Sequence, residues 1–211
     1  MKNKGVLYAL CAGISWGISL GIFGRTMTSF GFTAMQVSAV RTTISAITFI
    51  ILALVTDRKA FRLNPKDIWI FLCSGFISVT LFCWCYFTST RLCSLAVGGV
   101  LQYTAPVWVV VFSAVIFKEP ITKVKAAAML VAIAGCVLVS GITHGVGQVS
   151  AFGLVAGVFS GITYGSYTIF TRFAVPKYRT MTINVYTFIV ASATSLLLSG
   201  QIEDKDIVKE C

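Results

Sequence analysis

The chain has 211 residues, of which 57% are hydrophobic and 11% are charged, and its mean hydropathy is +0.88. Soluble domains carry about 25% charged residues, so this composition excludes a soluble globular protein. A net charge of +10 can indicate nucleic-acid binding, so the positions of the basic residues matter.

Seven apolar runs are long enough to cross a bilayer, which needs about 20 residues of helix per crossing. They cover residues 5–23, 35–55, 68–88, 94–117, 124–142, 149–171 and 182–198. The runs do not alternate apolar and polar residues and are too long for barrel strands, so they predict helices. The links between them are too short for a soluble domain. We therefore expect an all-α, polytopic integral membrane helix bundle.

Basic residues are unevenly shared between the two sides of this bundle. Twelve of the seventeen Lys and Arg residues lie at the N-terminus or in the second, fourth and sixth links. Four lie in the other links or the tail, and Arg41 lies inside a span. Because cytoplasmic segments of membrane proteins are enriched in Lys and Arg, the asymmetry predicts a cytoplasmic N-terminus. The charge orients the protein, and nucleic acid is not an expected partner.

One motif occurs twice. GISWG at 13–17 returns as GITYG at 161–165, and around each copy a small residue recurs every fourth position. The copies lie in the first and sixth spans, so the second copy is offset by five spans, an odd number, and is inverted. Inverted repeats are typical of transporters, with the substrate site near mid-membrane. The motif therefore predicts two five-helix repeats of opposite topology.

The residues of this motif have two interpretations. The glycines form flat helix faces, which favour close packing and also let one helix slide on another. We expect a packing role for Gly13, Gly17, Gly161 and Gly165. Trp16 and Tyr164 occupy equivalent positions at mid-depth, where a polar ring needs a partner or water. These two rings either line a central cavity or pack between helices.

The fourth span contains a predicted kink. Pro106 cannot donate a backbone hydrogen bond, so the carbonyl of Gln102 loses its helical partner. Tyr103 and Thr104 add polar side chains to the same turn. Such a turn is tolerated at membrane depth only against protein or a wet cavity. We interpret it as the best candidate for substrate contact, and a kink satisfied by Thr104 and a neighbouring helix is the alternative.

Arg41 is the one clear charge within a span, and every acidic residue lies in a link, a span end or the tail. Its functional interpretation is an anion contact and the alternative is an arginine that extends to the interface. We favour a structural role in the bundle, because Ser38, Thr42 and Thr43 make that face polar. Since proton relays use buried acids or histidines, passive or exchange transport is expected.

Cofactors and metals are not predicted. Cys83 and Cys85 are two residues apart on a helix, so they face different sides and cannot form a CxxC pair. With His144 as the only histidine, no zinc or haem site can be assembled. No nucleophile–base pair is visible in the spans either, so an enzyme is the least favoured class.

These features together resemble one known family. The repeated small-residue first helix, the turn at 101–106 and Glu119 ending the fourth span before a basic link are similar to the EamA family of the drug/metabolite transporter superfamily. The stretch 86–119 matches best. The resemblance implies ten spans, a cavity shared by both halves and alternating access. Glu119 is expected to have a structural role.

Two departures from the family pattern matter. Lys118 stands where the family usually has glycine, and the chain has seven predicted spans instead of ten. We expect residues 1–142 to form the first five-helix repeat and 143–211 to hold two helices of an incomplete second repeat and a polar tail. A truncated gene or a partial sequence explains this best.

The sequence thus predicts a transporter of small metabolites or drugs in the bacterial plasma membrane. The alternative is a truncated membrane fragment that acts only as a packing partner, and transport by such a fragment would need two chains to pair as a homodimer. A seven-helix receptor fits the inverted repeat badly. The expected partners are a small-molecule substrate and the lipid bilayer. The predicted substrate-binding residues are Trp16, Tyr86, Gln102, Tyr103, Pro106, Tyr164 and Tyr167.

Overall fold

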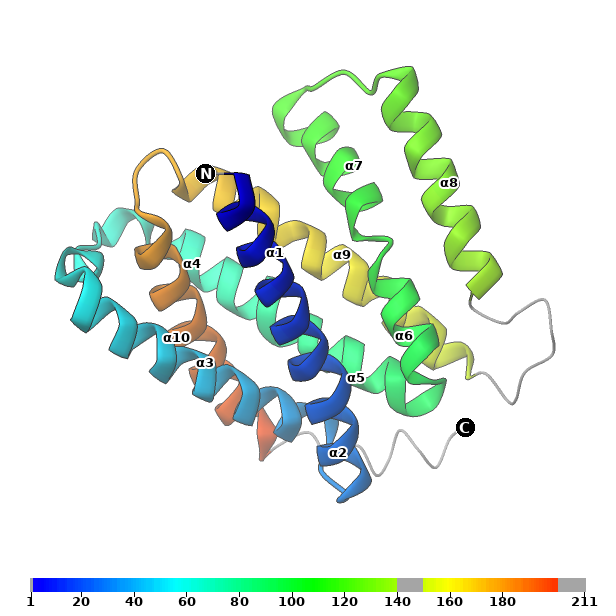
Figure 1. Ribbon diagram of the computed structural model, residues 1–211, viewed down its shortest axis with the longest axis horizontal. Helices are drawn as coiled ribbons and strands as arrows, with labels where there is room; N and C mark the ends of the chain where they lie inside the picture. Colours follow the sequence, from blue (N-terminus) through cyan, green and yellow to red (C-terminus); the bar gives the residue numbers. More distant parts are fainter. Residues whose placement is uncertain (1, 140–149, 201–211) are drawn as a thin grey trace.

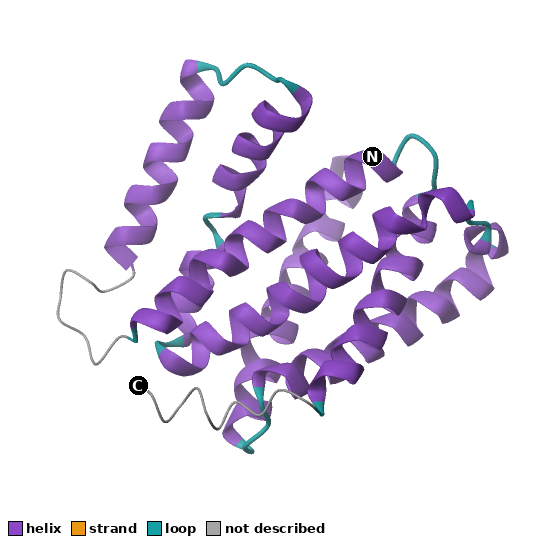
Figure 2. Ribbon diagram, turned by 180° about the vertical axis from the view of Figure 1, so that it is seen from behind, coloured by secondary structure: helices purple, strands orange, loops and turns teal. Residues whose placement is uncertain are grey.

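The computed structural model describes residues 2–139 and 150–200, and within these ranges all regular structure is helical (Figures 1 and 2). The all-α fold predicted from the sequence is confirmed. The first span is α1 (Lys2–Gly17), which continues through the π-helical η1 (Ile18–Phe23) into α2 (Gly24–Ser29). The second is α3 (Ala34–Thr56). A link containing the 3-10 turn η2 (Arg58–Phe61) follows.

Two of the next spans are interrupted. The third consists of the 3-10 turn η3 (Pro65–Asp67), α4 (Ile68–Gly75), the π-helical η4 (Phe76–Leu81) and α5 (Phe82–Leu92). The fourth is broken at Tyr103 and Thr104 into α6 (Leu95–Gln102) and α7 (Ala105–Phe117). The last three spans are α8 (Lys123–Val139), α9 (Ala151–Ala174) and α10 (Thr180–Ser199).

Four of these helical runs are both long and apolar enough to cross a membrane, judged by length and hydropathy. They are Ala34–Thr56, Pro65–Leu92, Leu95–Phe117 and Thr180–Ser199. The first helix, α8 and α9 complete a bundle of seven helices among the described residues, of which these four meet the criterion for crossing a membrane.

Local sequence signals explain several helix boundaries. Thr33 caps α3: its hydroxyl accepts from the Gln36 amide, and the Gln36 side chain accepts from the Thr33 amide. Serines cap α6 and α9 in the same position, through Ser94 and Ser150. Each cap satisfies an amide that has no partner inside the helix. The caps therefore fix where the chain enters three of the spans.

Lys118 ends α7 in the left-handed conformation, with φ 55° and ψ 31°. An L-residue there costs roughly 1–2 kcal/mol, which glycine avoids. The structure thus gives a physical reason for a glycine at this position and shows that Lys118 adopts the same turn without it. The turn brings Glu119 back toward the bundle.

Helices α9 and α10 pack around the third span. α9 contacts α4, η4, α5, α6 and α7, and α10 contacts α3, α4 and η4. Figure 1 shows α7 and α8 at one edge of the bundle, with α8 outermost. The C-terminal helices are therefore built into one core with the N-terminal ones.

Hydroxyl groups join α10 to its neighbours. Thr194 and Ser195 of α10 bond Thr80 of η4 at 2.7 Å and 3.2 Å, and Ser195 also bonds Ser38 at 3.2 Å. Two further pairs along α10 are Ser192 with Thr43 (2.8 Å) and Thr187 with Ser74 (3.3 Å). Hydrogen bonds between membrane helices contribute about 0.6 kcal/mol each. The series therefore sets the register of α10 more than it sets its stability.

The two glycine stripes of the repeated motif have different surroundings. On α9, a methyl group added at Gly161 would meet the Thr104 hydroxyl and the Leu101 carbonyl, and one at Gly165 would meet the Ala105 carbonyl at 3.1 Å. On α1, nothing among the described residues lies within 4 Å of such a group at Gly13 or Gly17. One stripe is packed tightly against the broken fourth span, and the other is open.

Ion pairs tie the link between α9 and α10 to two earlier links. The three acids of the described ranges each bond a cation of residues 172–179. They are Asp57 with Arg179 (2.7 Å), Asp67 with Lys177 (2.6 Å) and Glu119 with Arg172 (2.6 Å). Tyr178 donates a second hydrogen bond to Asp67 at 2.8 Å. The second, fourth and sixth links therefore meet at one end of the bundle.

Acidification is expected to weaken the ion pairs at this end of the bundle. The hydrogen bond from Arg179 lowers the pKa of Asp57, and that from Arg172 lowers the pKa of Glu119. A carboxyl group whose pKa is lower in the folded than in the unfolded protein stabilises the folded state at pH values above its unfolded pKa. This stabilisation is lost as the pH falls through the pKa of the folded state. Since unfolded carboxyls titrate near pH 4, the loss lies below about pH 4.

The measurement is the midpoint of unfolding in sodium dodecyl sulfate, followed by circular dichroism between pH 7 and pH 3. We expect the midpoint of the native chain to fall over this interval. The double variant Asp57→Asn and Glu119→Gln should start lower at pH 7 and fall less. An equal fall in both proteins would contradict the assignment to these pairs.

Candidate functional site

Two π-helical turns contribute residues to one buried cluster, through Leu20 and Val79. The first span contains η1, which follows Trp16 and Gly17, and the third contains η4, which includes Ser78 and Val79. A π turn widens the helix and displaces the side chains that follow, and such turns are frequent at functional sites. Both turns contribute residues to the same region of the interior.

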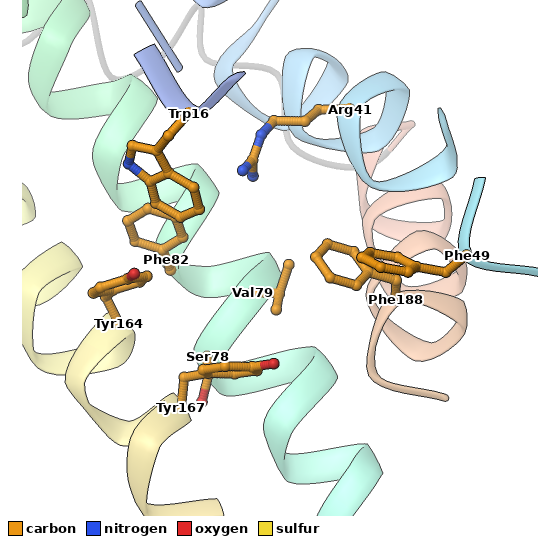
Figure 3. A pocket seen from close by; sticks show the side chains of 9 residues that line it. All are labelled: Trp16, Arg41, Phe49, Ser78, Val79, Phe82, Tyr164, Tyr167 and Phe188. Atoms are coloured by element: carbon orange, nitrogen blue, oxygen red, sulfur yellow. The ribbon is translucent and has the colours of Figure 1, made fainter. Parts of the chain in front are cut away.

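A cavity of about 250 Å³ lies between the end of α1, η4, the start of α5 and helices α3, α9 and α10 (Figure 3). Its lining is mainly aromatic and is drawn from both ends of the sequence. The lining residues are Trp16, Arg41, Phe49, Ser78, Val79, Phe82, Tyr164, Tyr167 and Phe188. The size suits one small organic molecule and its rings suit an apolar or flat one.

Ring contacts shape two walls of this cavity. Trp16 of α1 lies 5.6 Å from Tyr164 of α9, and Tyr164 lies 5.1 Å from Phe82 of α5, measured between ring centroids. On the other side Phe49 and Phe188 are stacked at 5.2 Å. Ring pairs at these separations stabilise one another by about 0.5–1.5 kcal/mol. These ring contacts therefore form both walls of the cavity before any ligand binds.

Polar groups at the cavity are few. The Arg41 side chain donates from Nε to the Ser19 hydroxyl at 2.9 Å and from Nη1 to the Cys83 sulfur at 3.0 Å. Its guanidinium carbon lies 5.6 Å from the Trp16 ring, within range of a cation–π contact. Ser78 bonds Ser166 of α9 at 2.7 Å. The cavity thus combines aromatic walls with one cation.

The profile of the EamA-like transporter family matches residues 3–141. The chain belongs to this family. A search of curated proteins and a search of solved structures each found no match. The EamA match covers about two thirds of the sequence and includes the pocket residues of α1, α3, η4 and α5. The chain is therefore an integral membrane protein of the drug/metabolite transporter type, a class that acts on small molecules in a lipid environment.

In this EamA chain the structure brings together three of the residues predicted to bind substrate. Trp16, Tyr164 and Tyr167 all line the cavity, and Tyr167 also donates a hydrogen bond to Asn184 at 3.2 Å. Arg41, for which a structural role is expected, lines it as well. Tyr86 is buried one layer behind, where its ring lies 5.9 Å from that of Phe82.

The turn of the fourth span lies elsewhere. Gln102 is buried and Tyr103 and Pro106 are exposed, and none of the three lines the cavity. Instead, the glycine stripe of α9 packs against this turn, with Gly161 next to Leu101 and Thr104. The Thr104 hydroxyl donates to the Leu101 carbonyl at 2.7 Å, which satisfies one acceptor at the break. The turn thereby positions α9, the helix that carries Tyr164.

Five lining residues were not among the predicted site residues: Phe49, Ser78, Val79, Phe82 and Phe188. Ser78 had a detectable signal, since it is a polar residue within an apolar span. The three phenylalanines had none, because the chain contains sixteen and a lipid-facing ring resembles a pocket ring in sequence. Among the described residues no group of three or more His, Cys, Asp or Glu is placed to hold a metal, and His144 lies outside them.

Proposed function

We propose that this chain moves small organic molecules across the bacterial plasma membrane by alternating access, with the aromatic cavity as its substrate site. The observation that carries the proposal is the origin of the lining: Trp16 and Phe82 come from the N-terminal segment and Tyr164 and Phe188 from the C-terminal one. A site shared by two segments opens to either side when one moves against the other.

The repeat supports the same proposal. Trp16 and Tyr164 are the equivalent residues of the two motif copies, and their rings are in contact at 5.6 Å. Residues related by a two-fold axis meet only near that axis. The contact therefore agrees with two inverted repeats, divided near residue 142, whose axis passes close to the cavity. Tyr86 and the turn at Gln102, Tyr103 and Pro106 are proposed to position these helices.

The orientation belongs to this proposal as well. The ion pairs join the second, fourth and sixth links, so these links lie on one side. They also carry most of the basic residues outside the N-terminus, which favours the cytoplasm for that side. The N-terminus lies on the same side as the second, fourth and sixth links, so it would then be cytoplasmic.

The alternative is a bundle without transport of its own that packs against another helix or a second copy of the chain. The open glycine stripe of α1 favours this alternative, because flat small-residue faces are contact surfaces between membrane helices. The two functions differ in one measurable respect, since only the first requires a compound to cross the membrane.

The test is uptake into liposomes that contain the purified chain. A growth-resistance screen on overexpression first supplies an accepted compound. We expect Trp16→Ala and Tyr164→Ala each to reduce its initial uptake rate by about tenfold, because losing the ring contacts costs on the order of 1.4 kcal/mol. Trp69→Ala is the matched control: Trp69 contacts Phe173 away from the cavity and should keep full uptake. Uptake equal to that of empty liposomes would favour the alternative.

A further inference from the structure

We propose that the cavity selects organic monoanions, with the Arg41 guanidinium binding a carboxylate and the aromatic walls holding the apolar body. The inference rests on the proposed function, because it names the substrate class of the same site. It goes beyond the structural role expected for Arg41 from sequence. Three properties of Arg41 carry it: its burial, its direction and its lack of an acidic partner.

Arg41 is buried and faces the cavity. Its exposed fraction is only 9%, and Figure 3 shows the guanidinium directed toward the space between Trp16 and Val79. A guanidinium has five N–H donors in a planar fork. Ser19 and Cys83 accept one hydrogen bond each, from Nε and Nη1. Donors therefore remain on the two terminal nitrogens for an acceptor in the cavity.

The charge of Arg41 is not balanced within the described residues. The three acids there, Asp57, Asp67 and Glu119, each bond a different cation at one end of the bundle. The Arg41 hydrogen-bond partners are a hydroxyl and a thiol, which are weak or neutral acceptors, and its other contact is the uncharged Trp16 ring. A cation inside a membrane bundle is costly unless it is paired or hydrated. A bound anion would supply the missing partner.

The remaining lining decides what kind of anion fits. Apart from Arg41, the polar side chains are Ser78 and the two tyrosines, and the rest are rings and Val79. One cation in such surroundings neutralises one negative charge, so a dianion such as a phosphate monoester would leave a charge uncompensated. Arginine binds a carboxylate through two parallel hydrogen bonds. A small aromatic or aliphatic carboxylate therefore fits best.

The test measures binding to the full chain in detergent by isothermal titration calorimetry, without transport. The probes are 3-phenylpropionate, the neutral 3-phenylpropionamide and the cationic 3-phenylpropylamine, which share one apolar body. We expect the carboxylate to bind at least tenfold more tightly than the amide and the amine to bind weakest. In Arg41→Gln this preference should vanish. Equal affinities for carboxylate and amide in the native chain would overturn the proposal.

Two variants guard against misfolding and non-specific charge effects. Arg41→Lys keeps the charge but loses the planar fork, so it should retain an intermediate preference for the carboxylate. Arg25→Gln removes an exposed arginine that does not line the cavity and should leave the preference unchanged. A preference that survives Arg41→Gln and disappears in Arg25→Gln would assign anion binding to the surface.

The outcomes separate this inference from the proposed function. A chain that binds the carboxylate through Arg41 but moves no compound supports the anion site and removes transport. A chain whose uptake of neutral or cationic compounds is unaffected by Arg41→Gln, and which shows no carboxylate preference, keeps the proposed function and removes the anion site.

Discussion

Replacing Gly161 by alanine is expected to destabilise the bundle by about 1–3 kcal/mol, whereas the same change at Gly13 should cost nothing. The two glycines occupy the same position in the repeated motif. At Gly161 the new methyl group would overlap the Thr104 hydroxyl and lie 3.1 Å from the Leu101 carbonyl. Backbone cannot rotate away as a side chain does, so the break between α6 and α7 must move.

At Gly13 the methyl group would enter space that no described residue occupies. Alanine also favours helix over glycine by up to about 1 kcal/mol, so Gly13→Ala is neutral or slightly stabilising. The measurement is the midpoint of unfolding in sodium dodecyl sulfate for both variants in one detergent. Equal midpoints for Gly161→Ala and Gly13→Ala would contradict the difference in packing between α9 and α1.

Truncating Phe71 to alanine is expected to cost about 3 kcal/mol and to loosen α10 in particular. Phe71 of α4 is 1% exposed and its ring contacts those of Tyr178 and Tyr186 at 5.4 Å and 5.7 Å. Loss of a buried ring leaves a cavity and removes its contacts, and such truncations cost about 3–5 kcal/mol in soluble cores. We take the lower value because lipid is itself apolar.

Leu72→Ala is the matched control for Phe71→Ala. Leu72 is the next residue of the same helix and is 49% exposed, so its removal costs few contacts inside the protein. Hydrogen exchange of the α10 amides should rise in Phe71→Ala and stay unchanged in Leu72→Ala. If exchange rises equally along every helix in Phe71→Ala, the ring does not hold α10 specifically.

The sequence was sufficient to predict the seven helices, because a bilayer imposes a minimum apolar length that few other structures share. It also predicted a break in the fourth span, where Pro106 removes a donor. It did not predict the π-helical turns η1 and η4, since neither contains proline and their geometry depends on the helices packed beside them. The helix propensity of individual residues does not reflect such tertiary effects.

The binding residues that the sequence predicted correctly lie in the repeated motif or, for Tyr167, two residues after it. Trp16 and Tyr164 stand at equivalent positions of the two motif copies, and both line the cavity. The turn at Gln102 carries the stronger local signal, yet it lies against α9 and not at the cavity. Proline and polar residues reveal an irregular backbone, but they do not reveal whether its neighbour is a ligand or another helix. Only the packing of α9 distinguishes the two.

The shared lining of the cavity has a thermodynamic consequence. Because Trp16 and Phe82 belong to one segment and Tyr164 and Phe188 to the other, a bound molecule joins both segments at once. A ligand that binds only the assembled bundle stabilises the assembly, by about 2.7 kcal/mol at a concentration one hundred times its dissociation constant. Occupancy of the cavity and the docking of α9 and α10 on the N-terminal helices are thus linked equilibria, and each strengthens the other.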